Sequence, residues 1–182
     1  MQIKTTSFDG LIEIFPDVFA DDRGWFYEFY KEETFKKNHL HYTFVQENQS
    51  FSKKGVVRGL HFQHPPYAQA KLVTALTGKV LDVVVDLRPT SKTFKQKYYC
   101  LLESSKRNML LIPEGFAHGF SALEDSIFFY KCSNVYNRGS EAGIRWDDPD
   151  LKIEWRVENP IISGKDSELP PLAALLENSL IS

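Results

Sequence analysis

Glycine and proline residues divide this chain into short segments rich in β-branched and aromatic residues, and this spacing limits the folds open to it. The dividing residues are Gly10, Pro16, Gly55, Pro65, Pro66, Gly78, Pro89, Pro113 and Gly115. Between them we expect strands over residues 11–15, 24–30, 43–52, 56–63, 71–76, 80–87, 98–102, 108–112, 118–122, 127–133 and 153–157. Helix signals are confined to residues 31–39 and 172–180. Many short strands with few helices predict an all-β sandwich or barrel.

Size and composition are those of one globular domain over residues 1–182. Hydrophobic residues make up 42% of the chain, which is enough for a core that needs no disulfides. The net charge of −2 lacks the basic character of a nucleic-acid-binding protein. An anionic ligand would therefore have to be bound by a few local Arg and Lys residues.

The two cysteines, Cys100 and Cys132, are not spaced as a zinc or redox motif. We interpret them as buried, reduced thiols. Residues 1–10 have no apolar signal core, and no apolar run approaches the roughly 20 residues that span a bilayer. We expect a cytoplasmic protein that makes no membrane contact.

Residues 78–88 show the clearest alternation in the chain. One face carries Leu81, Val83, Val85 and Leu87, and the other carries Val80, Asp82, Val84 and Asp86. A carboxylate between two valines is unusual on a face that only packs. Asp82 therefore points either into a polar cavity or, on a solvent-facing strand, into water.

Two segments have the spacing of paired cupin motifs: one contains Gly55, His61, Gln63 and Lys71, and the other runs from Pro113 to His118. Metal-binding cupins resemble this pattern but carry His-x-His followed by Glu, which form the first shell of a metal. Here Gln63 and Lys71 replace two of those ligands. A protonated lysine offers donors and no acceptor, so it repels a cation and requires an anion. The pattern predicts a cupin barrel without a metal.

His61, Lys71 and Tyr130 have the chemistry for proton transfer at a carbon next to a carbonyl. A histidine takes a proton near neutral pH, and an ammonium group stabilises the enolate oxygen that develops. Tyrosine, with an unperturbed pKa near 10, suits reprotonation from the opposite face. Each residue alone also fits a structural role, so the hypothesis depends on all three together. No glycine-rich nucleotide-cofactor motif or P-loop occurs, and we expect no cofactor.

The residues from about Phe8 to Leu172 resemble the dTDP-4-dehydrorhamnose 3,5-epimerase family. The longest shared motif is Gly55-Val56-Val57-Arg58-Gly59-Leu60-His61-Phe62-Gln63, which continues as Pro65-Pro66-x-x-Gln69-x-Lys71-Leu72-Val73. Further motifs are Asp22-Arg23-Gly24-x-Phe26-x-Glu28, Gln46-x-Asn48-x-Ser50-x-Ser52, Ile112-Pro113-x-Gly115-Phe116-Ala117-His118-Gly119-Phe120, Trp146-x-Asp148-Pro149 and Ser163-x-Lys165-Asp166.

This resemblance implies a cupin jelly-roll homodimer that inverts C3 and C5 of a dTDP-linked 4-keto-6-deoxy sugar. It implies that His61 is the base, Tyr130 the acid and Lys71 the partner of the C4 oxygen. It also implies that Asp166 orients His61 and that Asp82 orients His118.

The same resemblance implies a set of substrate-binding residues: Arg23, Glu28, Gln46, Asn48, Arg58, Tyr136, Glu141 and Lys165. Arg23 and Arg58 would bind the diphosphate, and Tyr136 would stack on thymine. Strict alternation places Arg58 on the strand face opposite His61. Both reach one cavity only if Gly59 marks a bulge or twist, or if Arg58 serves a neighbouring subunit. Arg156 and residues 94–97 depart from the family pattern outside the proposed chemical residues.

Three alternatives remain open from the sequence. The first is an enzyme that inverts a single carbon or uses another nucleotide. The second is a cupin that binds a nucleotide sugar without catalysis, which would be expected to lack the base or the acid. The third is a metal-dependent cupin oxygenase or isomerase.

Overall fold

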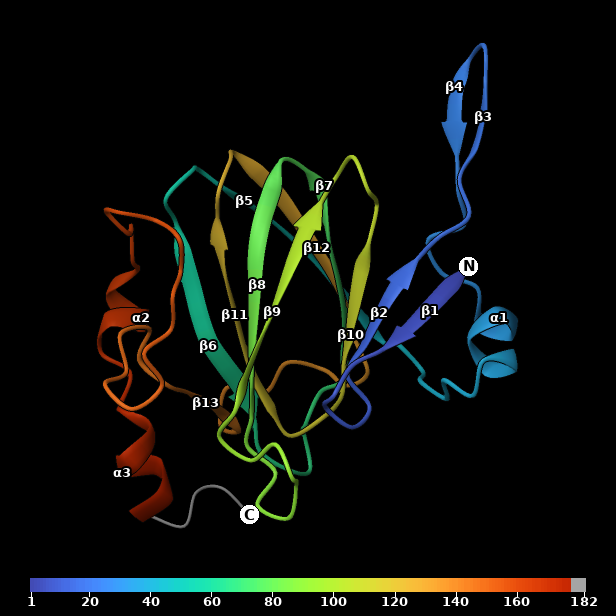
Figure 1. The fold of residues 1–182 in the computed structure, drawn as a ribbon. Coiled ribbons are helices and arrows are strands. Elements are labelled where there is room, and N and C mark those ends of the chain that lie inside the picture. The colour runs from blue at the N-terminus through green and yellow to red at the C-terminus, as the bar shows by residue number, and fades with distance from the viewer. Residues whose placement is uncertain (178–182) are drawn as a thin grey trace.

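The computed structural model describes residues 1–177, and two antiparallel β-sheets that face each other form most of it (Figure 1). The first sheet has the order β1 (Gln2–Thr5), β2 (Ile12–Phe15), β10 (Met109–Ile112), β7 (Lys71–Thr77), β12 (Ser126–Cys132) and β5 (Gln46–Ser52). The second has the order β13 (Glu141–Gly143), β6 (Val57–Gln63), β11 (Phe116–Ala122), β8 (Lys79–Asp86) and β9 (Lys97–Glu103). The prediction of an all-β sandwich or barrel is confirmed.

Short peripheral elements surround the sheets. A hairpin of β3 (Phe19–Asp21) and β4 (Gly24–Phe26) projects away from the barrel (Figure 1). Helix α1 (Glu32–Lys37) lies within the predicted helix, and α2 (Gly164–Ser167) and α3 (Leu172–Glu177) lie beside β6. The helix predicted over residues 172–180 begins as expected, and positions 178–180 lie outside the described residues.

Several predicted boundaries differ from the structure. Residues 153–157 form no strand, because their apolar side chains cover a sheet instead of joining one. Trp155 is buried there, and its indole N–H donates to the Trp146 carbonyl at 2.7 Å. The strand predicted over 24–30 ends at Phe26, and the one predicted over 43–52 begins at Gln46. Strands β1, β3 and β13 and helix α2 were not predicted, since three or four residues carry too little periodicity.

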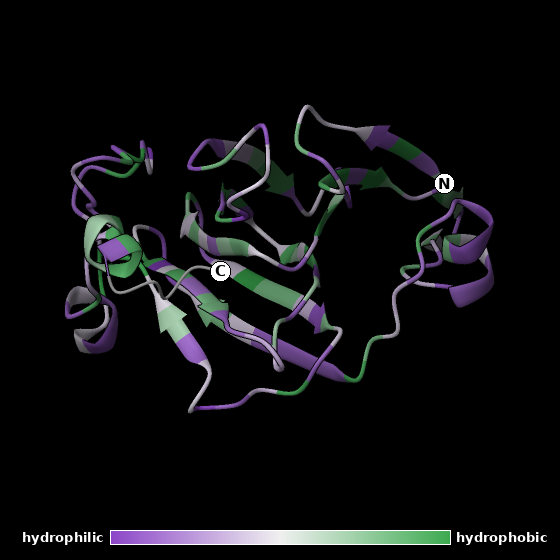
Figure 2. Ribbon diagram, turned by 90° about the horizontal axis from the view of Figure 1, so that it is seen from below, coloured by the Kyte–Doolittle hydropathy of each residue, from purple (hydrophilic) through white to green (hydrophobic). Residues whose placement is uncertain are grey.

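The alternation along β8 separates two hydrophobic cores. Val80 and Val84 point between the sheets, where they pack in one cluster with Phe120 and Phe128. The opposite face packs against the C-terminal segment, through a cluster that includes Leu81, Val83, Val85, Ile144, Trp155, Leu172 and Leu175. Figure 2 shows the resulting bands of hydrophobic and hydrophilic residues along the strands. Burying each such Val or Leu contributes about 1.5–3 kcal/mol.

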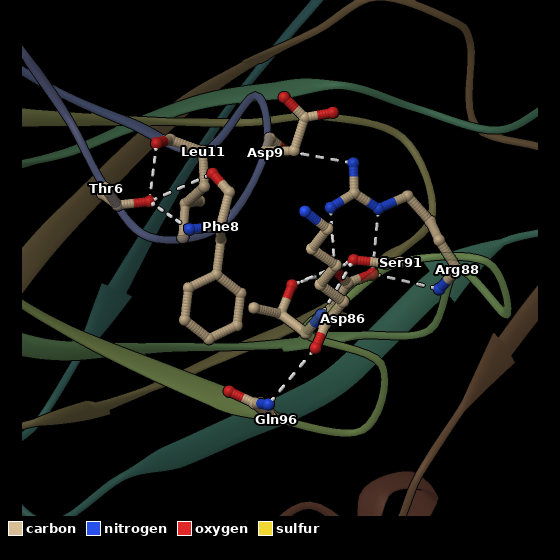
Figure 3. A network of polar contacts seen from close by, with 10 residues as sticks. Thr6, Phe8, Asp9, Leu11, Asp86, Arg88, Ser91 and Gln96 are labelled. Atoms are coloured by element: carbon tan, nitrogen blue, oxygen red, sulfur yellow. Dashed lines mark hydrogen bonds and ion pairs between the residues drawn. The ribbon is translucent and has the colours of Figure 1, made fainter.

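A polar network at the end of β8 fixes the β8–β9 loop (Figure 3). The fully buried Asp86 carboxylate accepts hydrogen bonds from Arg88 Nε at 2.9 Å, Arg88 Nη2 at 2.7 Å, Ser91 Oγ at 2.6 Å and Thr93 Oγ1 at 2.7 Å. Arg88 Nη1 continues the network to the Asp9 carbonyl at 3.0 Å. Burial alone would raise the pKa of Asp86, but these donors outweigh it and lower that pKa to about 2.

Candidate active site

A cavity with two lobes lies between the sheets. The first lobe, of about 300 Å³, includes Gln46, Asn48, Gln63, Cys132, Tyr136 and Glu141 in its wall. The second lobe, of about 290 Å³, includes Arg58, His118, Phe120, Ser163, Lys165 and Asp166. His61, Lys71 and Tyr130 are the three residues that line both lobes. The three side chains singled out for proton transfer therefore meet at the junction of the lobes.

His61 is held by a carboxylate that is distant in sequence. Its Nε2 lies 2.8 Å from Oδ1 of Asp166 in helix α2. Because an ionised carboxylate only accepts hydrogen bonds, Nε2 carries the hydrogen and Nδ1 keeps its lone pair. Burial alone would raise the pKa of Asp166, but the hydrogen bonds from His61 and from the Gly59 N–H hold that pKa below its ordinary value. The imidazole is thus oriented as a base.

His118 forms a second pair of the same kind deeper in the barrel. Its Nε2 lies 2.8 Å from Asp82 Oδ2, and Asp82 is fully buried. The other oxygen, Asp82 Oδ1, has no hydrogen-bond partner among residues 1–177. Of the two orientations left open by the sequence, the structure shows the polar-cavity one, since His118 lines the second lobe.

Lys71, at the start of β7, is the cation at the junction. Its ammonium group makes no hydrogen bond or ion pair with any described residue. Burial lowers the pKa of Lys71, because it penalises the charged form. An unpartnered ammonium group on a cavity wall attracts an anion or a developing oxyanion.

Tyr130 and Cys132 occupy the same face of β12, next to Lys71. Cys132 is paired with Lys71 in the strand register, and Tyr130 is paired with Val73. Burial raises the pKa of Tyr130, so its phenol stays protonated at neutral pH. Sequence reasoning treated Cys132 only as a buried thiol, yet it also lines the first lobe and accepts a long contact from Asn48 Nδ2 at 3.8 Å.

The rim of the first lobe is a connected polar group. Tyr136 donates from its hydroxyl to Glu141 Oε2 at 2.9 Å, and Lys165 Nζ donates to Glu141 Oε1 at 2.6 Å. Gln46 Nε2 donates to Asn48 Oδ1 at 3.1 Å. Glu141 lines the first lobe and Lys165 lines the second, so this ion pair lies where the two lobes meet.

A bulge in β6 brings Arg58 and His61 to the same cavity. His61 pairs with His118 and Arg58 with Phe120, so three steps along β6 match two along β11. Gly59 makes this possible with a φ of 112°, and a Cβ there would lie 2.5 Å from the Gly119 Cα. Of the two explanations that the sequence allowed, the structure shows the bulge. Arg58 lines the second lobe and donates to Ser52 Oγ and the Phe51 carbonyl.

Arg23 and Glu28 lie apart from this cavity in the chain. Arg23 is at the tip of the β3–β4 hairpin, where it pairs with Asp21 at 2.6 Å and is 90% exposed. Glu28 is exposed after β4 and lies 3.8 Å from Lys31. One chain alone therefore brings together twelve of the fourteen predicted site residues, and these two remain outside the group.

The described residues contain no cluster of three or more His, Cys, Asp or Glu side chains placed to hold a metal ion. At the first cupin motif, Gln63 and Lys71 stand in the wall of the first lobe. None of the helices within residues 1–177 is long and apolar enough to cross a membrane.

The fold, taken with the comparisons below, defines an isomerase of the cupin jelly-roll class. A family model described as dTDP-4-dehydrorhamnose 3,5-epimerase matches residues 5–174. The enzyme of that name from Methanothermobacter thermautotrophicus is 47% identical over 171 residues, which cover 92% of this chain and 92% of the relative. The chain belongs to the dTDP-4-dehydrorhamnose 3,5-epimerase family.

Solved structures of similar fold include a 3,5-epimerase and a 3′-monoepimerase. A 3,5-epimerase from Legionella pneumophila in complex with dTDP-4-keto-L-rhamnose has a TM-score of 0.93 and 39% identity, covering 99% of this chain and 96% of that one. A 3′-monoepimerase from Streptomyces bikiniensis in complex with dTDP-quinovose has a TM-score of 0.90 and 30% identity, covering 97% and 90%.

Proposed function

We propose that the chain inverts C3 and C5 of dTDP-4-dehydro-6-deoxy-D-glucose and so forms dTDP-4-dehydro-L-rhamnose. The observation that carries this proposal is the junction of the two lobes, where His61, Lys71 and Tyr130 meet. The choice of substrate is supported by a relative named dTDP-4-dehydrorhamnose 3,5-epimerase and by a similar structure in complex with dTDP-4-keto-L-rhamnose.

In the proposed reaction His61 Nδ1 removes the proton at C3. The electrons of that C–H bond move to the C4 carbonyl, and the Lys71 ammonium stabilises the resulting enolate oxygen. Tyr130 then donates its proton to C3 from the opposite face, which inverts the carbon. Proton exchange with water then returns His61 to its neutral form and Tyr130 to its protonated form, and the same sequence at C5 completes the double inversion. Protons alone are exchanged, so the balance of the reaction requires no electron carrier.

The substrate would follow the cavity from rim to interior. We infer that thymine stacks on Tyr136 beside Gln46 and Asn48, and that the diphosphate lies near Lys165 and Arg58. The keto sugar then enters the second lobe between His61 and His118. Guanidinium and ammonium groups on the path of a diphosphate favour this order.

We further propose a homodimer in which Arg23 and Glu28 complete the site of the other copy. The hairpin that carries Arg23 projects from its own barrel (Figure 1) and exposes Phe19 (64%), Trp25 (58%) and Phe26 (64%). Exposed aromatic residues next to a charged tip are typical of a surface that binds another chain. We propose a cytoplasmic location as well, because Cys100 and Cys132 are both free thiols.

Deuterium exchange tests the reaction. The protein, incubated with the keto sugar in deuterated water, should introduce deuterium at both C3 and C5, as read by NMR of the recovered sugar. If deuterium entered neither C3 nor C5, the assignment as an epimerase would be wrong.

A mixing experiment tests the shared site. Arg23→Ala and His61→Ala variants, each impaired alone, should regain about a quarter of wild-type activity when co-folded, because random pairing gives half mixed dimers with one intact site each. Light scattering at micromolar concentration should show a dimer. A monomer, or no recovery in the mixture, would contradict the proposal.

A second candidate is inversion of C3 alone. The similar fold of the 3′-monoepimerase favours it as the alternative. Deuterium at C3 with none at C5 would select this narrower activity. Competition of dTDP with other nucleoside diphosphates would establish the nucleotide preference.

A further inference from the structure

The loop that follows β12 is held by glutamine side chains instead of a strand ladder. Residues 133–137 have no regular structure. Gln69 Nε2 donates to the Asn134 carbonyl at 2.8 Å, and Gln46 Oε1 accepts from the Tyr136 N–H at 2.8 Å. Backbone groups outside a sheet need such partners, because an unpaired buried group is costly.

Gln63 makes the most contacts with this loop. Its Nε2 donates to the Val135 carbonyl at 3.1 Å and to the Tyr67 carbonyl at 2.6 Å, and its Oε1 accepts from the Asn137 N–H at 2.7 Å. Only 9% of the residue is exposed. Gln63 thus binds the residues immediately before and after Tyr136, and it uses both donors of its amide.

The Tyr136 hydroxyl and the backbone on either side of Tyr136 are bound by the same strand pair, β6 and β13. Its hydroxyl donates to Glu141, and Glu141 is paired with Gln63 in the β13–β6 register. The residues that flank Tyr136 and the partner of its hydroxyl therefore share one anchor, while the Tyr136 N–H itself is bound by Gln46. Displacing Gln63 would move the plane of the Tyr136 ring relative to the first lobe.

We propose that Gln63 is a positioning residue that orients Tyr136 for the nucleobase. The inference rests on the proposed function only in assigning the base to Tyr136. Gln63 occupies the place where metal-binding cupins carry their second histidine. In this chain that position anchors the loop at the cavity rim.

A double-mutant cycle with dTDP as the probe tests this role. Gln63→Met keeps the length of the side chain and removes its hydrogen bonds. It should raise the Kd for dTDP about tenfold, equivalent to ~1.4 kcal/mol, while kcat for exchange at saturating substrate changes less than about threefold. In a Tyr136→Leu background the same change should alter Kd by less than about twofold. An equal loss in both backgrounds would overturn the inference, as would a Tyr136→Leu variant that binds dTDP normally.

Gln63→Glu gives a second readout that packing alone would not produce. An ionised carboxylate would face two carbonyl oxygens, whereas the protonated acid again donates to one of them. The Kd of this variant for dTDP should therefore improve as pH falls, relative to Gln63→Met at the same pH. Matching pH profiles for the two variants would contradict the proposal. Gln96→Met, an exposed glutamine that bonds a loop carbonyl away from the cavity, is the matched control.

Failure of this inference and failure of the proposed reaction give different results. A wild-type protein that binds dTDP but exchanges no deuterium would reject the reaction. The dTDP cycle would still report directly on Gln63.

Discussion

His61 and His118 are paired directly across β6 and β11, and each Nε2 lies 2.8 Å from a separate carboxylate. The two rings differ in their surroundings. The His61 side chain is 31% exposed, and the His118 side chain is 9% exposed beside fully buried Asp82. The more accessible ring, at the junction of the lobes, is the one that can meet a substrate proton.

Removing the base should separate catalysis from binding. We expect His61→Ala to lower the rate of deuterium exchange at both C3 and C5 by roughly a hundredfold to ten-thousandfold, the usual contribution of a general base. The Kd for dTDP should stay within about threefold, because the contacts proposed for the nucleotide are made by other residues. NMR-detected exchange and calorimetry measure the two effects. The exposed His41→Ala is the control, and normal exchange in His61→Ala would show that the base is misassigned.

Removing the acid should uncouple exchange from inversion. In Tyr130→Phe the enolate still forms, and it can be reprotonated by His61 on the face it came from. We expect deuterium to enter C3 while formation of the inverted product falls at least about a hundredfold. Chiral analysis of the recovered sugar measures this. Tyr99→Phe, which lines neither lobe, serves as control, and an inverted product at the normal rate would exclude Tyr130 as the acid.

The alkaline limit of activity should report Lys71. In the proposed mechanism its protonated form stabilises the enolate, and burial lowers its pKa from the ordinary value of 10.5. Consequently kcat/KM for exchange should fall as pH rises through a value below 10.5. Burial raises the pKa of Tyr130 above its ordinary value of 10.0, so its phenol is a second group that titrates on the alkaline side.

Lys71→Arg distinguishes this group from others that titrate at high pH. Arginine stays charged throughout the range. The variant should be slower, and its alkaline decline should shift to higher pH. An unchanged position of the decline would assign it to another group.

Asp86 should make stability depend on pH in the acid range. Its folded pKa of about 2 lies below the ordinary 3.8, so its contribution is present above pH 4 and is lost as pH falls towards 2. Replacing it by Asn should cost ~2 kcal/mol near pH 7, and the difference from wild type should shrink between pH 4 and pH 2. Urea unfolding at several pH values measures this.

Asp147→Asn is the matched control for Asp86. Asp147 also pairs with an arginine two residues away, but its side chain is 39% exposed against 0% for Asp86. An exposed pair contributes at most about 1 kcal/mol. Equal losses in the two variants would show that burial of the Asp86 network is not what stabilises it.

The sequence was most informative where spacing and chemistry coincide. The alternation of residues 80–87 predicted both faces of β8, because a period of two survives in any packed strand. The cupin motifs predicted that His61, Lys71 and His118 surround one cavity, and all three line the second lobe. Residues 153–157 were misread because an apolar run can cover a sheet as readily as it can join one.

Other parts of the site depend on tertiary contacts that no local pattern encodes. The sequence predicted only that Gln63 replaces a metal-binding histidine. Its hydrogen bonds were not predictable, because its three partners lie in loops that are distant from one another or irregular in sequence pattern. The direction in which the β3–β4 hairpin projects was likewise not predictable, because it depends on how the chain leaves the sheet after β2. A search for buried glutamines next to irregular segments would have found the first of these signals.

The single extra residue of β6 has a consequence for the size of ligand this barrel accepts. Arg58 and His61 lie three residues apart on β6, which is paired with strands on both sides, so the fold fixes the separation of their backbone positions. In the proposed complex this spacing determines which sugar carbon lies at the imidazole when the diphosphate is bound at Arg58. A nucleotide sugar with a longer or shorter phosphate bridge would bring the wrong carbon to the imidazole.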